Sequence, residues 1–195
     1  MISRLRKLPL AALALLAVFA LSACGDSHSK VSTGTYAGES GANAPYLDVG
    51  PLRYEVQISR QLNPYNSEDA AYLSGLRPAD RTLQPGQEWF GVFLQVYNTG
   101  DRPRLAATNV TISDTQGNVY SPLVPGPSNE YAFRGGFVPA MSRVPPLDTT
   151  AGFGPTQGAL LLYKIHTVSL DNRPLVVKIT DPNDLAESAQ AELDV

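Results

Sequence analysis

The chain is nearly free of the side chains that build redox and metal centres. It has one cysteine, two histidines and two methionines among 195 residues. A single cysteine forms no intramolecular disulfide, so the folded part must be held together by packing. Zinc and copper sites need several Cys, His or Met ligands, but His28 lies in the segment just after the leader, and only Met141 and His166 remain in the part expected to fold. We predict no metal site and no cofactor.

Basic residues are also scarce in the part of the chain that follows the leader. The first 23 residues contain three of the fifteen Lys and Arg residues and none of the eighteen Asp and Glu residues. The remaining chain therefore carries twelve basic and eighteen acidic residues, a net charge of −6. This charge argues against nucleic acid and anionic lipid as electrostatic partners.

The N-terminus has the pattern of a bacterial lipoprotein signal. A basic leader with Arg4, Arg6 and Lys7 precedes an apolar run over residues 8–21, which is too short for a comfortable membrane span. The sequence that follows, LSAC over residues 21–24, resembles a lipobox. The resemblance implies cleavage after residue 23 and attachment of diacylglycerol to the thiol of Cys24.

The alternative interpretation of this segment is an ordinary secretory signal with an incidental cysteine. A cysteine that stands at the end of the apolar run and nowhere else favours the lipoprotein. Each buried methylene adds roughly 0.8 kcal/mol of membrane affinity. Two or more acyl chains therefore hold a protein stably on a bilayer, whereas a protein with a single chain dissociates and rebinds. We therefore expect a signal peptide over residues 1–23 and a protein on the extracytoplasmic face of the cell membrane.

The rest of the chain divides into a tether, a β-rich domain and a tail. Residues 24–50 are rich in Ser, Gly, Thr and Ala, which predicts a flexible tether. The domain is expected over residues 51–181, and an acidic, marginally helical, frayed C-terminal tail over 182–195. Asn66 or Ser67 could cap a short helix that ends near Gly75.

Alternating apolar residues predict strands within the domain. They are expected around residues 52–59, 88–97, 109–113, 119–120, 158–166 and 174–181. In the 88–97 strand, Phe90, Val92, Leu94 and Val96 share one face, whereas Trp89, Phe93 and Tyr97 share the other, which predicts a central position. With sixteen Gly and sixteen Pro to form turns, the pattern is typical of an all-β, antiparallel β-sandwich.

The central segment over residues 88–123 resembles bacterial lipoproteins that carry the domain of unknown function 4352. The resemblance rests on a long apolar strand that ends in Asn98-Thr99-Gly100, followed by the Asp114 to Gly117 turn and then Tyr120. It implies an immunoglobulin-like fold over residues 52–180 and a closing hairpin from the last two strands. Two further stretches, QLNPYNSEDAAYL and DNRPL, resemble lipoproteins of actinobacteria. No functional residue is implied.

No arrangement of residues typical of an enzyme is present. Ser27-x-x-Lys30 matches a motif of penicillin-recognising enzymes, but it lies in the tether without its companion motifs. His166 stands alone at a strand end, where a packing role is expected. Asp114, Gln116 and Asn118 offer oxygens for calcium, yet they also suit a tight turn, which we favour. We predict a protein that is not an enzyme.

The long connection over residues 121–156 offers the best candidate for partner binding. Such a long segment inside a compact domain is usually functional or disordered. It contains Tyr131, Phe133, Arg134 and Phe137, which would suit a protein, peptide or glycan surface. The alternative is that these aromatic side chains fold back over the sandwich edge, and we favour it.

The function predicted from the sequence is a lipid-anchored, non-enzymatic binding or interaction module of the cell envelope. Its partners would be the membrane, through Cys24, and an envelope protein or glycan. The alternatives are a solute- or metal-ion-binding accessory protein of a transporter and, third, an envelope hydrolase.

Overall fold

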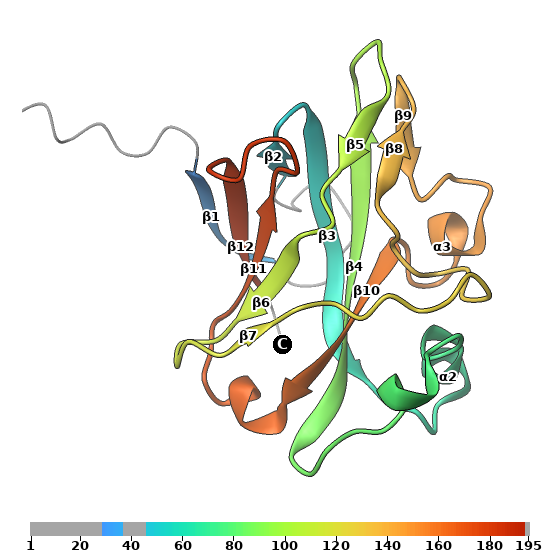
Figure 1. Ribbon diagram of the computed structural model, residues 1–195, viewed down its shortest axis with the longest axis vertical. Helices are drawn as coiled ribbons and strands as arrows, with labels where there is room; N and C mark the ends of the chain where they lie inside the picture. Colours follow the sequence, from blue (N-terminus) through green and yellow to red (C-terminus); the bar gives the residue numbers. More distant parts are fainter. Residues whose placement is uncertain (1–28, 37–45, 194–195) are drawn as a thin grey trace, which may run out of the picture.

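The computed structural model describes residues 29–36 and 46–193, which form two packed β-sheets (Figure 1). The predicted signal peptide and Cys24 lie outside these residues. The first sheet consists, in spatial order, of β1 (Ser29–Tyr36), β12 (Ser188–Leu193), β11 (Leu175–Thr180), β6 (Val110–Ser113) and β7 (Val119–Tyr120). The second consists of β10 (Ala159–His166), β4 (Gln87–Asn98), β3 (Leu52–Leu62) and β2 (Tyr46–Val49), and β9 (Ser142–Val144) also pairs with β4.

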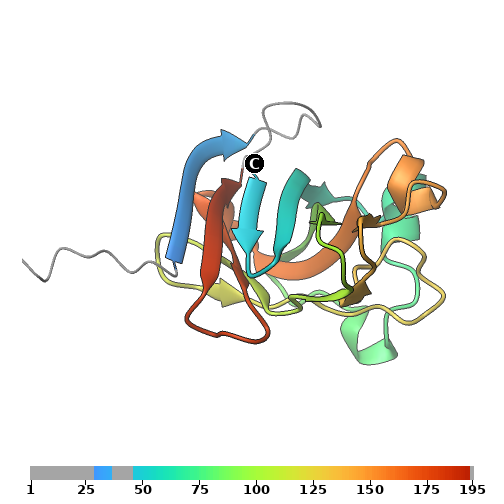
Figure 2. The same cartoon turned by 90° about the horizontal axis from the view of Figure 1, so that it is seen from above.

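Smaller elements complete the sandwich. A separate two-stranded sheet pairs β5 (Arg104–Ala106) with β8 (Gly136–Val138). The helices of the described part are α2 (Ser67–Tyr72), α3 (Thr150–Phe153) and the 3-10 turns η2 (Pro78–Asp80) and η3 (Thr167–Leu170). Seen from above, α2 and α3 lie on the flank opposite β1 and β12 (Figure 2).

The strand arrangement is immunoglobulin-like. Strands β4 and β10 are neighbours in one sheet, whereas β6, β11 and β12 are neighbours in the other. These five strands take the places of B, E, C, F and G in an immunoglobulin domain. The prediction of an antiparallel β-sandwich is confirmed.

The alternation in the central strand produces two separate clusters of buried side chains. One face of β4 contributes to the core between the sheets, through Phe90, Val92, Leu94 and Val96. The other face contributes Trp89 and Phe93 to a cluster beneath α2. Both faces of β4 are therefore covered, as the sequence predicted for a central strand.

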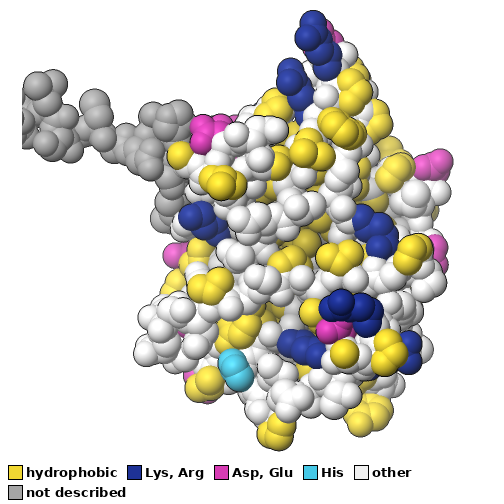
Figure 3. Space-filling model, viewed as in Figure 1, with side chains coloured by type: hydrophobic (Ala, Val, Ile, Leu, Met, Phe, Trp, Pro, Cys, Tyr) yellow, Lys and Arg dark blue, Asp and Glu magenta, His cyan; other side chains and the backbone are white. Residues whose placement is uncertain are grey.

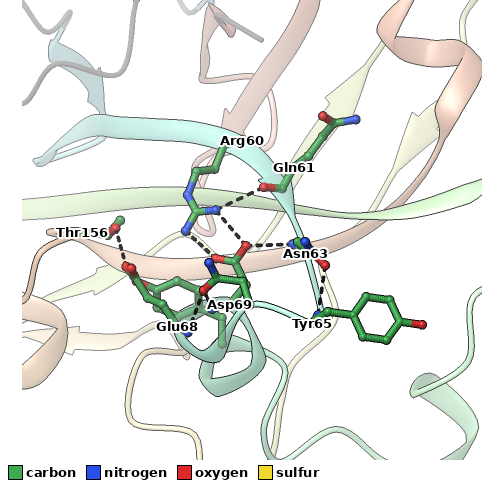
Figure 4. A network of polar contacts seen from close by, with 9 residues as sticks. Arg60, Gln61, Asn63, Tyr65, Glu68, Asp69 and Thr156 are labelled. Atoms are coloured by element: carbon green, nitrogen blue, oxygen red, sulfur yellow. Dashed lines mark hydrogen bonds and ion pairs between the residues drawn. The ribbon is translucent and has the colours of Figure 1, made fainter.

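Helix α2 is held on the outer face of the second sheet by an ion pair. Arg60 of β3 donates from Nη2 and Nη1 to the two carboxylate oxygens of Asp69, at 2.6 and 3.1 Å (Figure 4). The Asn66 side chain caps the helix by accepting from the amide of Glu68 at 2.9 Å. A short helix capped by Asn66 or Ser67 was predicted, and the structure selects Asn66; the ion pair was not predicted.

Both predicted flexible ends contain strands, which corrects the assignment of 24–50 as a tether and of 182–195 as a tail. β1 pairs in parallel with β12, and β2 pairs with β3. β12 buries Ala189, Ala191 and Leu193 in the core. Sequence reasoning missed β12 because Ala and Glu have low strand propensity, and its pairing with β11 outweighs that preference.

The expected closing hairpin is not formed. β10 pairs with β4 in the second sheet, whereas β11 pairs with β6 and β12 in the first. The 3-10 turn η3 carries the chain from one sheet to the other. The C-terminal hairpin is therefore β11–β12, and the segment that was predicted to be a tail supplies half of it.

The long connection over 121–156 contains β8, β9 and α3, so it is more regular than the sequence indicated. Its backbone also bridges to β10, since Leu123 pairs with Leu162 and Ala132 with Leu160. These bridges cover a sheet edge that would otherwise present unpaired amides and carbonyls.

Candidate interaction surface

The four side chains proposed for partner binding do not form one surface. Phe133 is 5% exposed and belongs to the main core, and Tyr131 packs edge-on against Tyr72 at 4.8 Å between ring centroids. Arg134 donates to the carbonyls of Pro125, Gly126 and Asn129 at 2.5 to 2.9 Å. Phe137 alone among the three aromatic residues is strongly exposed, at 71%.

An asparagine that sequence reasoning did not single out holds this connection in place. Asn129 is buried, and its Nδ2 donates to the carbonyls of Tyr72 and Ser74 at 2.8 and 2.9 Å. Its Oδ1 accepts from the amides of Tyr131 and Ala132, both at 3.0 Å. Tyr131 and Phe133 fold back because this side chain fixes the backbone between them and α2, whereas Phe137 stays exposed.

The turn whose oxygens could have suited calcium is a closed set of hydrogen bonds. Asp114 Oδ1 accepts from the amides of Gln116 and Asn118, and Oδ2 accepts from Asn118 Nδ2 and Ser169 Oγ. Burial opposes ionisation of the carboxyl, but these four donors outweigh it and lower the pKa of Asp114 to about 2. The arrangement has the geometry of a tight turn.

His166 lies exposed at the end of β10, with its ring 6.1 Å from that of Tyr120. Within residues 29–36 and 46–193, no three His, Cys, Asp or Glu side chains are grouped closely enough to hold a metal ion. The same residues contain no helix long and apolar enough to span a membrane.

Phe137 lines a groove at one end of the sandwich, which we call the acidic groove. It has a volume of about 530 Å³ and is formed by the β2–β3 turn, the start of β5, β8 and the β11–β12 connection. Its lining residues are Gly50, Pro51, Pro103, Arg104, Leu105, Phe137, Asp181, Asn183, Asp184 and Glu187. The volume lies in the range of roughly 300–1,000 Å³ that is typical of ligand pockets.

The acidic side of this groove is built by the β11–β12 connection. Asp181 Oδ1 accepts from the amides of Asn183 and Asp184, at 2.6 and 3.0 Å. Glu187 Oε1 accepts from the amide of Gly50 at 2.8 Å, which ties this connection to the β2–β3 turn. These bonds use Oδ1 of Asp181 and Oε1 of Glu187, so they do not involve Oδ2 of Asp181 or Oε2 of Glu187.

The opposite side of the groove, formed by β5 and β8, is mainly apolar apart from Arg104. Phe137 and Leu105 face each other across the β5–β8 ladder as a paired register position, and Leu105 is 37% exposed. Figure 3 shows hydrophobic side chains on the upper part of this face, over β5 and β8, with acidic side chains at the upper left, over the β11–β12 connection. The groove therefore combines an aromatic wall with an acidic one.

A second cavity, which we call the Arg143 pocket, lies near the β8–β9 turn. It has a volume of about 430 Å³ and is lined by Tyr97, Asn98, Thr99, Met141, Ser142, Arg143, Pro146 and Leu147. Arg143 Nη1 donates to Gln95 Oε1 at 2.8 Å, while its buried Nε has no hydrogen-bond partner. Burial, reinforced by the carboxylate of Glu55, raises the pKa of Tyr97 to about 12.

Few signals in the sequence indicated the acidic groove. Asp181, Asp184 and Glu187 fall in or beside the segment that was predicted to fray, and Leu105 was not singled out. The available signal was the alternation of Ala189, Ala191 and Leu193 with Gln190 and Glu192, which predicts a strand and therefore a fixed turn before it.

Comparison with known proteins yields no family assignment. No family profile matches the chain, and no curated protein matches it by sequence. The likeness to the domain of unknown function 4352 and the actinobacterial origin therefore stay predictions.

Three solved structures have limited similarity to this chain. ycdA of Bacillus subtilis, described as a candidate lipoprotein, is 12% identical with a TM-score of 0.44 over 79% of this chain and 39% of its own length. yjhA of Bacillus subtilis is 10% identical with a TM-score of 0.49, over 83% of this chain and 100% of its own. An uncharacterised β-sandwich protein of Clostridium difficile is 13% identical with a TM-score of 0.41, over 85% and 95%. At these values the likenesses say nothing about function.

Proposed function

We propose that the protein is a lipid-anchored, extracytoplasmic binding module of the cell envelope, without catalytic activity. The anchor is Cys24, at the end of the leader. The observation that supports a binding role is the acidic groove, where Phe137 stands 71% exposed beside three carboxylates, whereas Phe133 of the same connection is buried in the core. Exposed aromatic anchors beside fixed polar groups are typical of interaction sites.

The anchor would hold the domain close to the bilayer. β1 begins at Ser29, five residues after Cys24. Five extended residues span at most about 18 Å. The predicted tether over 24–50 would have allowed a much larger separation, but β1 and β2 take up part of it.

Membrane fractionation tests the anchor. Replacing Cys24 by Ser removes the thiol that receives the lipid, so the variant should move from the membrane to the soluble or secreted fraction. Ser27→Ala is the matched control, because it leaves the lipobox intact and should stay membrane-bound. A Cys24→Ser variant that remains with the membrane contradicts the anchoring proposal.

Photocrosslinking in cells tests the binding role. A photoreactive amino acid in place of Phe137 should give discrete adducts, because this side chain lines the groove. The same amino acid in place of Val119 is the control, since Val119 is similarly exposed, at 63%, but lies on β7 away from the groove. Absence of adducts at position 137, or equal adducts at both positions, contradicts the proposal.

A second candidate function is binding of a small solute, as an accessory protein of a transporter. The Arg143 pocket favours it, because a cavity of about 430 Å³ is lined by a cationic side chain, that of Arg143. Thermal-shift screening against anionic solutes, repeated with Arg143→Gln, tests this function. A solute that raises the melting temperature of both proteins equally does not bind there.

A further inference from the structure

The acidic groove has an uneven distribution of charge. Three carboxylates, those of Asp181, Asp184 and Glu187, share it with one guanidinium, that of Arg104. The hydrogen bonds to backbone amides fix Asp181 and Glu187 in position, so their charges are held at the groove without further ordering. A preorganised acidic wall favours a cationic partner and raises the rate of its association.

The apolar wall adds a requirement for an apolar side chain beside the cation. Phe137 and Leu105 lie exposed next to Pro103 and Pro51, all of them lining the groove. A free metal ion or a small polar cation would leave this wall exposed to water. A peptide that alternates basic and apolar side chains would cover it and would also neutralise the carboxylates.

The strand register places the groove at the end of the domain where the chain enters the fold. Ser29, the first residue of β1, pairs with Ser188, which follows Glu187 directly. β1 and β12 run parallel, so both begin at this end. Since Cys24 precedes Ser29 by five residues, an anchored domain would hold the groove near the bilayer, and this step rests on the proposed lipid anchor.

We infer that the acidic groove binds a cationic, partly apolar peptide segment of an envelope protein, close to the membrane surface. An apolar side chain of the segment packs on Phe137 and Leu105. Its Lys or Arg side chains pair with Asp184 and Glu187. The overall charge of −6 after the leader gives the same preference over longer distances.

Fluorescence anisotropy with the purified full-length protein in neutral detergent micelles tests the inference. The probe is a labelled, end-blocked KLKLK peptide. The comparison probes are ELELE, which reverses the charge, and KSKSK, which removes the apolar side chains. KLKLK should bind at least about tenfold more tightly than either, and its affinity should fall with added salt.

Matched variants locate the binding. Asp184→Asn combined with Glu187→Gln keeps the carbonyl oxygens that accept the local hydrogen bonds and removes both charges, and Phe137→Ser removes the aromatic wall. Each should weaken KLKLK binding about tenfold. The controls Asp171→Asn and Val119→Ser alter exposed residues outside the groove and should leave the affinity unchanged.

Three outcomes overturn the inference: equal binding of ELELE, binding that the groove variants do not weaken, and no binding of KLKLK. A fourth is groove-dependent binding of an N-acetylglucosamine oligomer or of phosphatidylglycerol vesicles in place of the peptide. The proposed binding role is judged separately by the crosslinks at position 137. Adducts there with an acidic partner would retain that role and reject the cationic segment.

Discussion

The α-carbon of Gly50 lies directly against the carboxylate of Asp181. A Cβ built on this glycine overlaps Asp181 Oδ2, and the backbone here has a φ of +55°, a left-handed conformation that side chains disfavour. The contact joins the β2–β3 turn to the β11–β12 connection, which are 131 positions apart in sequence but adjacent in the acidic groove.

Gly50→Ala should therefore destabilise the protein by about 3 kcal/mol, since steric overlap adds to the cost of the left-handed backbone. Gly117→Ala is the matched control. Gly117 also has a positive φ, +84°, but its Cβ would meet nothing within 4 Å, so about 1 kcal/mol is expected. Urea unfolding measures both values. Equal losses would mean that the contact with Asp181 relaxes without cost.

Asp69→Asn should lower stability by about 2 kcal/mol, because it leaves the partly buried Arg60 guanidinium without its anionic partner. The side chains of Arg60 and Asp69 are 29% and 7% exposed. Burial opposes the charge on Asp69, but the hydrogen bonds from Arg60 and the Asn63 amide outweigh it and lower its pKa.

The matched control for this ion pair is Asp80→Asn. Asp80 pairs with Arg77 at 2.6 Å, but the Arg77 side chain is 78% exposed, so solvent screens the interaction. A change of less than about 0.5 kcal/mol is expected from urea unfolding. If both variants lose the same stability, the Arg60–Asp69 pair does not hold α2 on the sheet.

Asp114 should make the protein sensitive to acid. Its pKa is about 2 in the folded state, against about 3.9 in an unfolded chain. Its contribution to stability is therefore complete above about pH 5 and is lost progressively as the pH falls through about 4 toward 2. Urea midpoints measured between pH 6 and pH 2.5 should fall less steeply in Asp114→Asn than in the natural chain. Identical slopes would contradict this account.

Ala189→Glu should be strongly destabilising, by about 3 kcal/mol or more, because it places a carboxylate in the core between the two sheets. Gln190→Glu on the same strand points to the opposite face and is half-buried, so a change below about 1 kcal/mol is expected. Thermal unfolding of the two variants distinguishes a structural β12 from a frayed tail. If both substitutions have almost no effect on stability, residues 188–193 behave as a frayed tail and not as a strand of the core.

The sequence by itself determined the class of fold and the local elements within it. The alternation along residues 88–97 predicted both buried faces of β4, and the alternation that starts at Leu52 predicted the core face of β3 as far as Val56. A bulge after Val56 then places Ile58 against the cluster beneath α2. The capping signal at Asn66 or Ser67 predicted the helix start, because it comes from neighbouring residues in the chain. Asp114 was correctly assigned to a tight turn for the same reason. The position of Cys24 after an apolar leader indicated the anchor, which stays a prediction.

Tertiary structure decided how these elements are joined and which side chains reach the surface. β12 forms a strand because it pairs with β11. β10 and β11 lie in different sheets because β10 pairs with β4, whereas β11 pairs with β6 and β12. Of the aromatic residues in the connection over 121–156, Phe133 is buried in the core and Phe137 is exposed. The acidic groove joins residues from positions 50 to 187, and no local pattern could bring them together because their proximity depends on the pairing of distant strands.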